Sequence, residues 1–117
     1  MGLCTHDHAP AMSPAEAFEA LAGSAVLVDV REPDEWAAGH APEAVHVPLA
    51  SVAASASGLP TDVPVIVICR SGRRSDAAAI ELRRSGVDAI NLTGGMQAWQ
   101  QAGGSVVRDD GQPGSVI

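Results

Sequence analysis

Four short runs of aliphatic residues are spaced along the chain, and longer segments with helical spacing separate them. The runs occupy residues 25–30, 45–47, 65–68 and 89–92. A short run that is apolar on both faces is typical of a strand buried in a parallel sheet. The most hydrophobic run, residues 65–68, is therefore expected to be the central strand.

The segments between the strands predict helices. In chain order these are residues 14–23, 33–38, a loosely helical connection over 49–62, 75–85 and 96–102. The first helix has the clearest start, because Ser13 and Glu16 have the spacing of a capping box and a proline stands at the first helical position. Strands that alternate with helices predict an α/β fold, in which a parallel sheet carries helices on both faces.

The two ends of the chain lack this periodicity. Residues 1–11 and 108–117 are polar and contain Pro and Gly, so we expect a flexible tail at each end. One domain over residues 12–107 agrees with the length of 117 residues, since domains commonly contain about 100 to 200.

The composition narrows the function classes. The net charge of −7 argues against a sequence-independent grip on nucleic acid, and no apolar run is long enough to span a membrane. The two cysteines, Cys4 and Cys69, lie far apart and fit no disulfide framework. The N-terminus lacks the basic and apolar regions of a secretory signal. We therefore expect a cytoplasmic protein that binds neither nucleic acid nor membranes.

One segment is basic although the chain as a whole is acidic. Residues 69–74 hold three of the seven basic residues and no acidic one. Cys69 follows the expected central strand, and ligands of parallel sheets bind at the carboxyl ends of strands. Loop amides, a helix N-terminus and guanidinium groups would all favour a thiolate there. The sequence predicts that Cys69 is a nucleophile with a lowered pKa, and the alternative is a buried cysteine that only packs.

This segment and three others resemble a known family. Residues 69–75, Cys-Arg-Ser-Gly-Arg-Arg-Ser, resemble the active-site loop C-x-x-G-x-R-S of the rhodanese sulfurtransferases. In the family's order, residues 27–36 are similar to LxDVRxxxE(Y/W/F), residues 39–49 to GHIPGAxNIP, and residues 92–99 to LxGGxxAW. The resemblance covers about residues 13–107. It implies the rhodanese fold, a twisted parallel sheet of about five strands flanked by helices on both faces.

The resemblance also implies a reaction. The Cys69 thiolate would attack the outer sulfur of a donor such as thiosulfate, sulfite would leave, and a Cys69 persulfide would form. Cyanide or a thiol would then accept the sulfur in a ping-pong mechanism. The implied partners are a small-molecule sulfur donor and a cyanide, small-thiol or protein acceptor, and the reaction requires no cofactor and no metal.

The residues of this loop are expected to have different roles. The predicted substrate-binding loop consists of Arg70, Ser71, Gly72, Arg73, Arg74 and Ser75. Arg70 and Arg73 are expected to bind an anionic donor, because arginine recognises oxyanions well, although a solvated basic patch is the alternative. For Arg74, substrate contact and an ion pair with an acid in residues 29–35 are equally open.

Residues outside the loop are expected to support it. Asp29 and Arg31 should hold loops together, and His40 and His46 should act as hydrogen-bonding partners of loops rather than as catalytic bases. Both tryptophans, Trp36 and Trp99, are expected to pack in the core or at the pocket edge.

Three further interpretations remain open. The related phosphatases and arsenate reductases have the spacing C-x5-R, which would need Arg at position 75, where this chain has Ser75. A persulfide carrier or a regulatory binding module is the other alternative, although such modules typically lack the cysteine. Residues 4–8, which include Cys4, could bind a soft metal or resolve the Cys69 persulfide, or could form an unstructured leader.

Overall fold

The computed structural model describes residues 8–117 and arranges five strands in one all-parallel sheet. The strands are β1 (Ala11–Met12), β2 (Val26–Asp29), β3 (Val45–His46), β4 (Val65–Ile68) and β5 (Ala89–Leu92). Their order is β1-β5-β4-β2-β3, so β4 lies at the centre, and all its residues are buried. The predictions of an α/β fold with a parallel sheet, and of residues 65–68 as its central strand, are confirmed.

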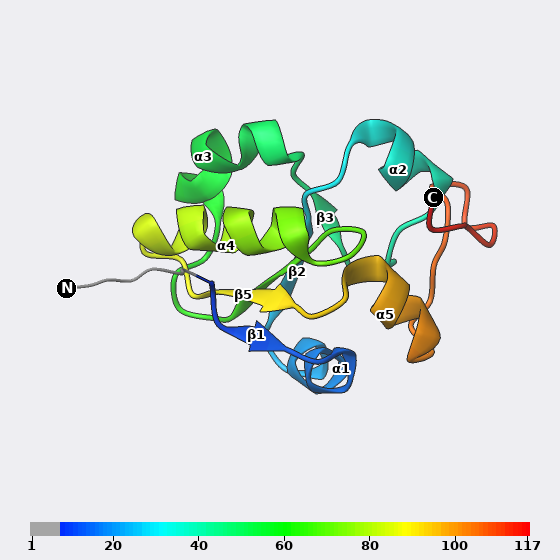
Figure 1. Ribbon diagram of the computed structural model, residues 1–117, viewed down its shortest axis with the longest axis horizontal. Helices are drawn as coiled ribbons and strands as arrows, with labels where there is room; N and C mark the ends of the chain where they lie inside the picture. The colour runs from blue at the N-terminus through cyan, green and yellow to red at the C-terminus, as the bar shows by residue number, and fades with distance from the viewer. Residues whose placement is uncertain (1–7) are drawn as a thin grey trace.

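Helices cover both faces of this sheet (Figure 1). They are α1 (Pro14–Ala22), α2 (Pro33–Ala38), α3 (Val52–Ser55), α4 (Arg73–Arg84) and α5 (Gly95–Gln101). Two 3-10 turns, η1 (Leu49–Ser51) and η2 (Ala56–Gly58), flank α3. The connection expected to be loosely helical is thus three short helical pieces.

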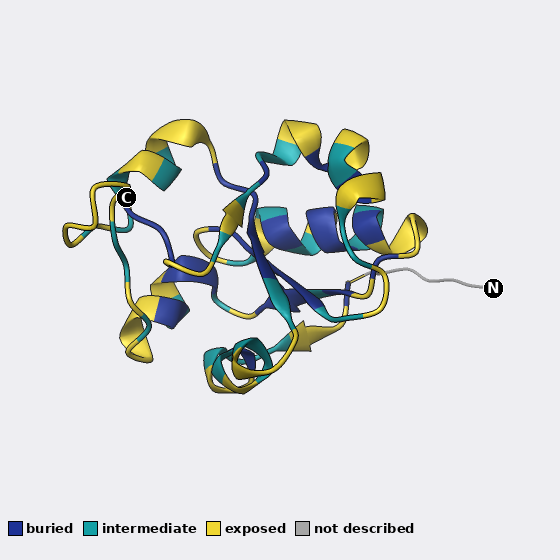
Figure 2. Cartoon of the chain, turned by 180° about the vertical axis from the view of Figure 1, so that it is seen from behind, coloured by how far each residue is buried: buried dark blue, intermediate teal, exposed yellow. Residues whose placement is uncertain are grey.

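Alternate residues of β4 build two separate apolar clusters, because successive side chains of a strand point to opposite faces. Val65 and Val67 belong to the cluster that includes α3 and α4. Ile66 and Ile68 belong to the cluster that includes α1 and α5. Buried residues accordingly concentrate in the central strands and on the inner side of α4 (Figure 2). Cys69, the next residue, falls on the α4 side of the sheet.

The start of α1 is formed as predicted. Ser13 accepts from the backbone N–H of Glu16 at 3.2 Å, and the Glu16 carboxylate accepts from the backbone N–H of Ser13 at 2.8 Å. Two later helices begin earlier than predicted. Helix α4 starts at Arg73 instead of residue 75, and α5 starts at Gly95 instead of residue 96. In both cases a glycine in the left-handed conformation precedes the helix and replaces a side-chain cap.

The N-terminal boundary differs from the prediction of a tail over residues 1–11. Residues 11 and 12 form β1, which pairs with β5, and Pro10 O accepts from the backbone N–H of Asn91 at 2.8 Å. His8 and the backbone N–H of Ala9 both contact the Asp76 carboxylate, at 2.8 and 2.9 Å. Residues 8–11 therefore lie along the sheet edge and the first turn of α4.

Residues 108–117 were expected to form a flexible tail, and in the structure they are bonded to the domain. The backbone N–H of Ser115 donates to Ala38 O at 2.8 Å, and that of Gly114 donates to Val106 O at 2.9 Å. Val116 packs against the cluster that includes α1 and α5. This segment therefore runs beside the loop that follows α2. Among residues 8–117, no helix is long and apolar enough to cross a membrane.

Candidate active site

Cys69 lies directly after β4, and only 1% of the residue is exposed. The chain then turns within three residues into α4. The backbone N–H of Gly72 lies 3.1 Å from the Cys69 Sγ, and the Ser75 hydroxyl lies 3.3 Å from it. The turn needs glycine at position 72, because its φ of +106° is in the left-handed region. The sulfur therefore sits in a nest of donors between strand and helix.

The hydrogen-bond donors around Cys69 shift the pKa of its thiol. Burial by itself raises the pKa of Cys69, because it disfavours the charged form. Hydrogen bonds from the Ser75 hydroxyl and from the backbone N–H groups of Ser75, Gly72 and Ser71 act in the opposite direction and prevail. The pKa of Cys69 is therefore held below its usual value, as predicted; the loop amides were among the predicted causes, whereas the Ser75 hydroxyl was not.

Helix α5 holds the active-site loop through backbone hydrogen bonds. The backbone N–H of Met96 donates to Cys69 O at 2.7 Å, and that of Gln97 donates to Arg70 O at 3.1 Å. Gly95 has φ +60°, and a methyl group there would lie 2.6 Å from the carbonyl carbon and oxygen of Arg70. The glycine pair of the LxGG segment is thus more than a turn, because it lets α5 approach the active-site loop.

Asn91 joins the site although the sequence analysis did not single it out. Its Nδ2 donates to Gly72 O at 3.0 Å, and its Oδ1 accepts from the Ser75 hydroxyl. It comes from β5, where it is the only polar residue. A polar residue inside an otherwise apolar buried strand is the signal that could have indicated it, since buried polar groups need partners.

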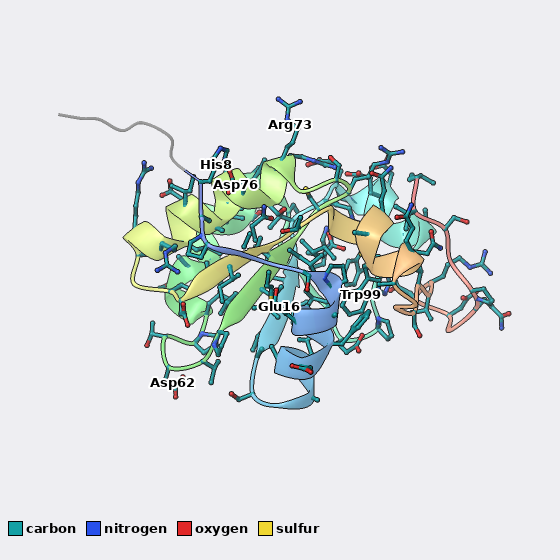
Figure 3. The ribbon with its side chains drawn as sticks, turned by 60° about the horizontal axis from the view of Figure 1, so that its bottom comes forward. His8, Glu16, Asp62, Arg73, Asp76 and Trp99 are labelled. Carbon is teal, nitrogen blue, oxygen red and sulfur yellow. The ribbon has the colours of Figure 1, made fainter. Side chains whose placement is uncertain are left out.

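The three loop arginines take three different directions. Arg74 makes a bidentate ion pair with Glu35 of α2, with N–O distances of 2.7 and 2.8 Å. This is the ion pair that was one of the two expectations for Arg74. Arg70 Nε donates to Ile117 O at 2.9 Å. Arg73 is exposed and points away from the molecule (Figure 3). Binding of an anionic donor by Arg70 and Arg73 stays a prediction.

The Arg74–Glu35 pair strongly perturbs both groups. The hydrogen bond from Arg74 is the largest cause that lowers the pKa of Glu35, to about 2, and the same bond raises the pKa of Arg74. The pair connects α2 to the first turn of α4. It therefore holds α2 against the start of α4, next to the active-site loop.

We expect this pair to make stability depend on pH. The folded pKa of Glu35, about 2, is below the ordinary 4.5, so its stabilisation is present above pH 4.5 and is lost as pH falls toward 2. Between pH 6 and 3, urea unfolding should show wild type losing about 1–2 kcal/mol more than Glu35→Gln, after allowance for partial exposure. Glu81→Gln, which removes an exposed pair with Arg84, is the control and should behave like wild type. Equal pH dependence of wild type and Glu35→Gln would contradict the expectation.

The family model for the Rhodanese-like domain matches residues 13–102. The chain belongs to the rhodanese-like family. A rhodanese-related protein from Thermoplasma volcanium is 30% identical, with a TM-score of 0.77 over 84% of this chain and 97% of that one. A rhodanese homologue from Thermus thermophilus is 32% identical, with a TM-score of 0.64 over 76% of this chain and 99% of that one. A rhodanese-like domain protein from Staphylococcus aureus is 29% identical, with a TM-score of 0.71 over 77% and 90%.

The prediction of the rhodanese fold is thereby confirmed, as is the predicted family. The match covers most of the 117 residues and nearly the full length of these relatives, so this chain is a single rhodanese-like domain. The range matched by the family model leaves out β1 and the C-terminal segment that contacts Arg70, although β1 is one of the five strands of the sheet.

Two supporting residues of the rhodanese-like domain form a buried ion pair. Arg31 and Asp29 are both fully buried, and Arg31 Nη2 donates to the Asp29 carboxylate at 2.8 Å and to Gly39 O at 2.7 Å. Asp29 is paired with Ile68 in the sheet, directly before Cys69. The pair thus joins the end of β2 to the loop after α2, which is the structural role expected for both residues.

The two histidines are engaged with backbone carbonyls. His40 Nδ1 donates to Trp36 O at 2.8 Å, and His46 Nε2 donates to Arg31 O at 2.7 Å. Both imidazole rings stack on Trp36, with centroid distances of 3.6 and 4.7 Å. These contacts agree with the expected role in holding loops. Trp99 is buried and packs edge-on against Phe18 at 4.8 Å, as expected for a core residue.

The suggested roles of Cys4 concern residues that lie outside the described part of the chain. His8, the last residue of that segment, is described and lies beside Asp76 (Figure 3). Among residues 8–117, no group of three or more His, Cys, Asp and Glu side chains could hold a metal ion.

Proposed function

We propose that this rhodanese-like protein is a sulfurtransferase that carries sulfane sulfur as a persulfide on Cys69. The observation that carries the proposal is the nest around the sulfur: N–H and O–H donors converge on a thiol whose pKa they lower. A thiolate at neutral pH is the nucleophile that covalent catalysis needs. The same donors can stabilise the negative charge of a persulfide.

The reaction has two half-reactions that balance in atoms and charge. In the first, the Cys69 thiolate attacks the outer sulfur of thiosulfate, the S–S bond of the donor breaks, and sulfite leaves with the bonding electrons. In the second, cyanide or a thiolate attacks the outer sulfur of the persulfide, and the Cys69 thiolate is released. No proton has to be removed from Cys69 once it is ionised, so His40 and His46 need no part in the chemistry.

Thiosulfate or a persulfide is the proposed donor, and a thiol, cyanide or a protein thiol is the proposed acceptor. We place the reaction in the cytoplasm, because an unpaired reactive cysteine suits a reducing compartment. A persulfide carrier that serves one protein partner would use the same Cys69. Fast turnover with small thiols would favour the enzyme, whereas turnover that requires a protein acceptor would favour the carrier.

A phosphatase function is disfavoured by the position and the ion pair of the loop arginine, Arg74. The related phosphatases have a C-x5-R loop, whereas Arg74 is one position earlier and is held by Glu35. We expect no hydrolysis of a phenyl phosphate beyond that of a Cys69→Ser variant.

Intact mass measurement tests the proposed function. The reduced protein is incubated with excess thiosulfate, and a gain of one sulfur atom, about 32 Da, is expected. Cyanide or a thiol should reverse the gain, and Cys69→Ser should show none. A protein that gains no sulfur from thiosulfate or from a small-molecule persulfide would refute the proposal.

A further inference from the structure

The Ser75 hydroxyl lies between two groups that compete for its single proton. Ser75 is fully buried, and its Oγ contacts both the Cys69 Sγ, at 3.3 Å, and the Asn91 Oδ1. A serine hydroxyl has one proton to donate, so only one of these contacts can receive it at a time.

The orientation of the Asn91 side chain is fixed by its other contact. Gly72 O can only accept, so the amide atom 3.0 Å from it is the donor Nδ2. The amide oxygen Oδ1 must then face Ser75, and because Oδ1 carries no proton, this contact depends on the hydroxyl proton. When Cys69 is a neutral thiol, the hydroxyl can donate to Asn91 while the S–H donates to the Ser75 Oγ. When Cys69 is a thiolate, the hydroxyl has to turn toward the sulfur.

We infer that Asn91 is a positioning residue that competes with Cys69 for the Ser75 hydroxyl proton and so limits how strongly the site stabilises the thiolate. This inference rests on the proposed role of Cys69 as the nucleophile. The position of the hydroxyl proton then alternates between Cys69 and Asn91 during the reaction cycle. In the persulfide the negative charge lies on the outer sulfur and Sγ is neutral, so the hydroxyl proton can return to Asn91. Asn91 thus stabilises the loaded state relative to the thiolate and keeps the thiolate reactive.

A role in holding the loop would have the opposite effect on the thiol. If Asn91 served only to hold Gly72 O, its removal would loosen the loop, weaken the N–H donation from Gly72 to the sulfur and raise the pKa of Cys69. If Asn91 competes for the proton, its removal releases the Ser75 hydroxyl to the thiolate and lowers that pKa. The direction of the change therefore separates the two roles.

Charged groups around Cys69 are the same in all the variants needed. They are the Asp29–Arg31 pair at the end of β2, the Glu35–Arg74 pair between α2 and α4, Arg73 and Asp76 in the first turn of α4, and Arg70 in the loop. Strand β5 and helix α5 contribute no charged residue. An uncharged replacement at position 91 therefore changes hydrogen bonding without changing the charge of the site.

Leucine is the replacement of choice because it has nearly the shape of asparagine. A cavity of about 320 Å³ borders Asn91, Gly72 and Arg73 and gives the leucine side chain room to adjust. Asn91→Ala is a second variant that needs no space at all. Circular dichroism and urea unfolding select the variants that remain folded.

The experiment measures the rate of iodoacetamide alkylation of Cys69 against pH, with thiolate ultraviolet absorbance as a second readout. Asn91→Leu should lower the midpoint by about 0.5–1 pH unit, and Ser75→Ala should raise it by a similar amount. In the double variant the effect of Asn91→Leu should vanish, because the proton for which Asn91 competes is gone.

The inference would be overturned by a midpoint that rises or stays unchanged in the Asn91 variants, or by a shift that persists without the Ser75 hydroxyl. Neither readout involves a sulfur donor. The measurement therefore distinguishes a failure of this inference from a failure of the proposed sulfur transfer, which the mass gain tests separately.

Discussion

Replacing Gly95 by alanine should destabilise the domain by about 3 kcal/mol or more and abolish the reactivity of Cys69. Two costs combine. The φ of +60° is unfavourable for alanine, and the new methyl group would overlap Arg70 C and O at 2.6 Å, and Cys69 O more closely still. Both neighbours are backbone of the active-site loop, so they can yield only by moving the loop. Urea unfolding and the iodoacetamide rate measure the two effects.

Gly103→Ala is the matched control for this prediction. Gly103 has a φ of +96° and lies just after the same helix, but a methyl group added there would have no atom within 4 Å. Its replacement should cost only the conformational part, about 1 kcal/mol, and leave alkylation of Cys69 unchanged. If both variants lose the same stability and keep the same reactivity, close approach of α5 to the loop is not what position 95 provides.

Those parts of the fold that have dense local signals could be predicted from the sequence. Residues 65–68 are aliphatic at every position, so a central strand buried on both faces was the simplest interpretation. The capping box at Ser13 uses residues only three apart, and the structure forms both of its bonds. The order of the four motifs was enough to predict the family and therefore the sheet.

The strand β1 could not be predicted in this way. Its two residues, Ala11 and Met12, are held by backbone pairing with β5, and such pairing leaves no pattern in the side chains. The early start of α4 has a similar cause. Arg73 follows a glycine whose backbone conformation begins the helix, so no capping side chain marks the boundary.

In the candidate site, the cysteine could be predicted but the partners of its neighbours could not. Arg70, Arg73 and Arg74 are close in sequence, yet they point to the C-terminal segment, to solvent and to α2. These directions follow from the path of the loop and from elements that lie 39 and 47 residues away along the chain. Asn91 was missed for the same reason, because its partners Gly72 and Ser75 meet it only after β4 and β5 have paired.

The buried ion pair leads to the other large effect that we expect. Arg31→Met should destabilise the domain by about 3–5 kcal/mol in urea unfolding, because the Asp29 carboxylate would remain fully buried without its cation. The variant also removes the bond from Arg31 to Gly39 O. Arg84→Met is the control: its side chain is 71% exposed and pairs with Glu81, and it should cost no more than about 0.5 kcal/mol.

A second variant separates the effect of the unpaired buried charge on stability from the effect of the lost packing. In Asp29→Asn/Arg31→Met no buried charge is left without a partner, and the amide oxygen of the new side chain can still accept from the backbone N–H of residue 31, as the Asp29 carboxylate does now at 2.9 Å. The double variant should therefore recover much of the stability that Arg31→Met loses. A double variant as unstable as the single one would mean that the arginine acts through its packing and its bond to Gly39. In that case the loop after α2 depends on the length and fork of the guanidinium group, and the carboxylate next to it is secondary.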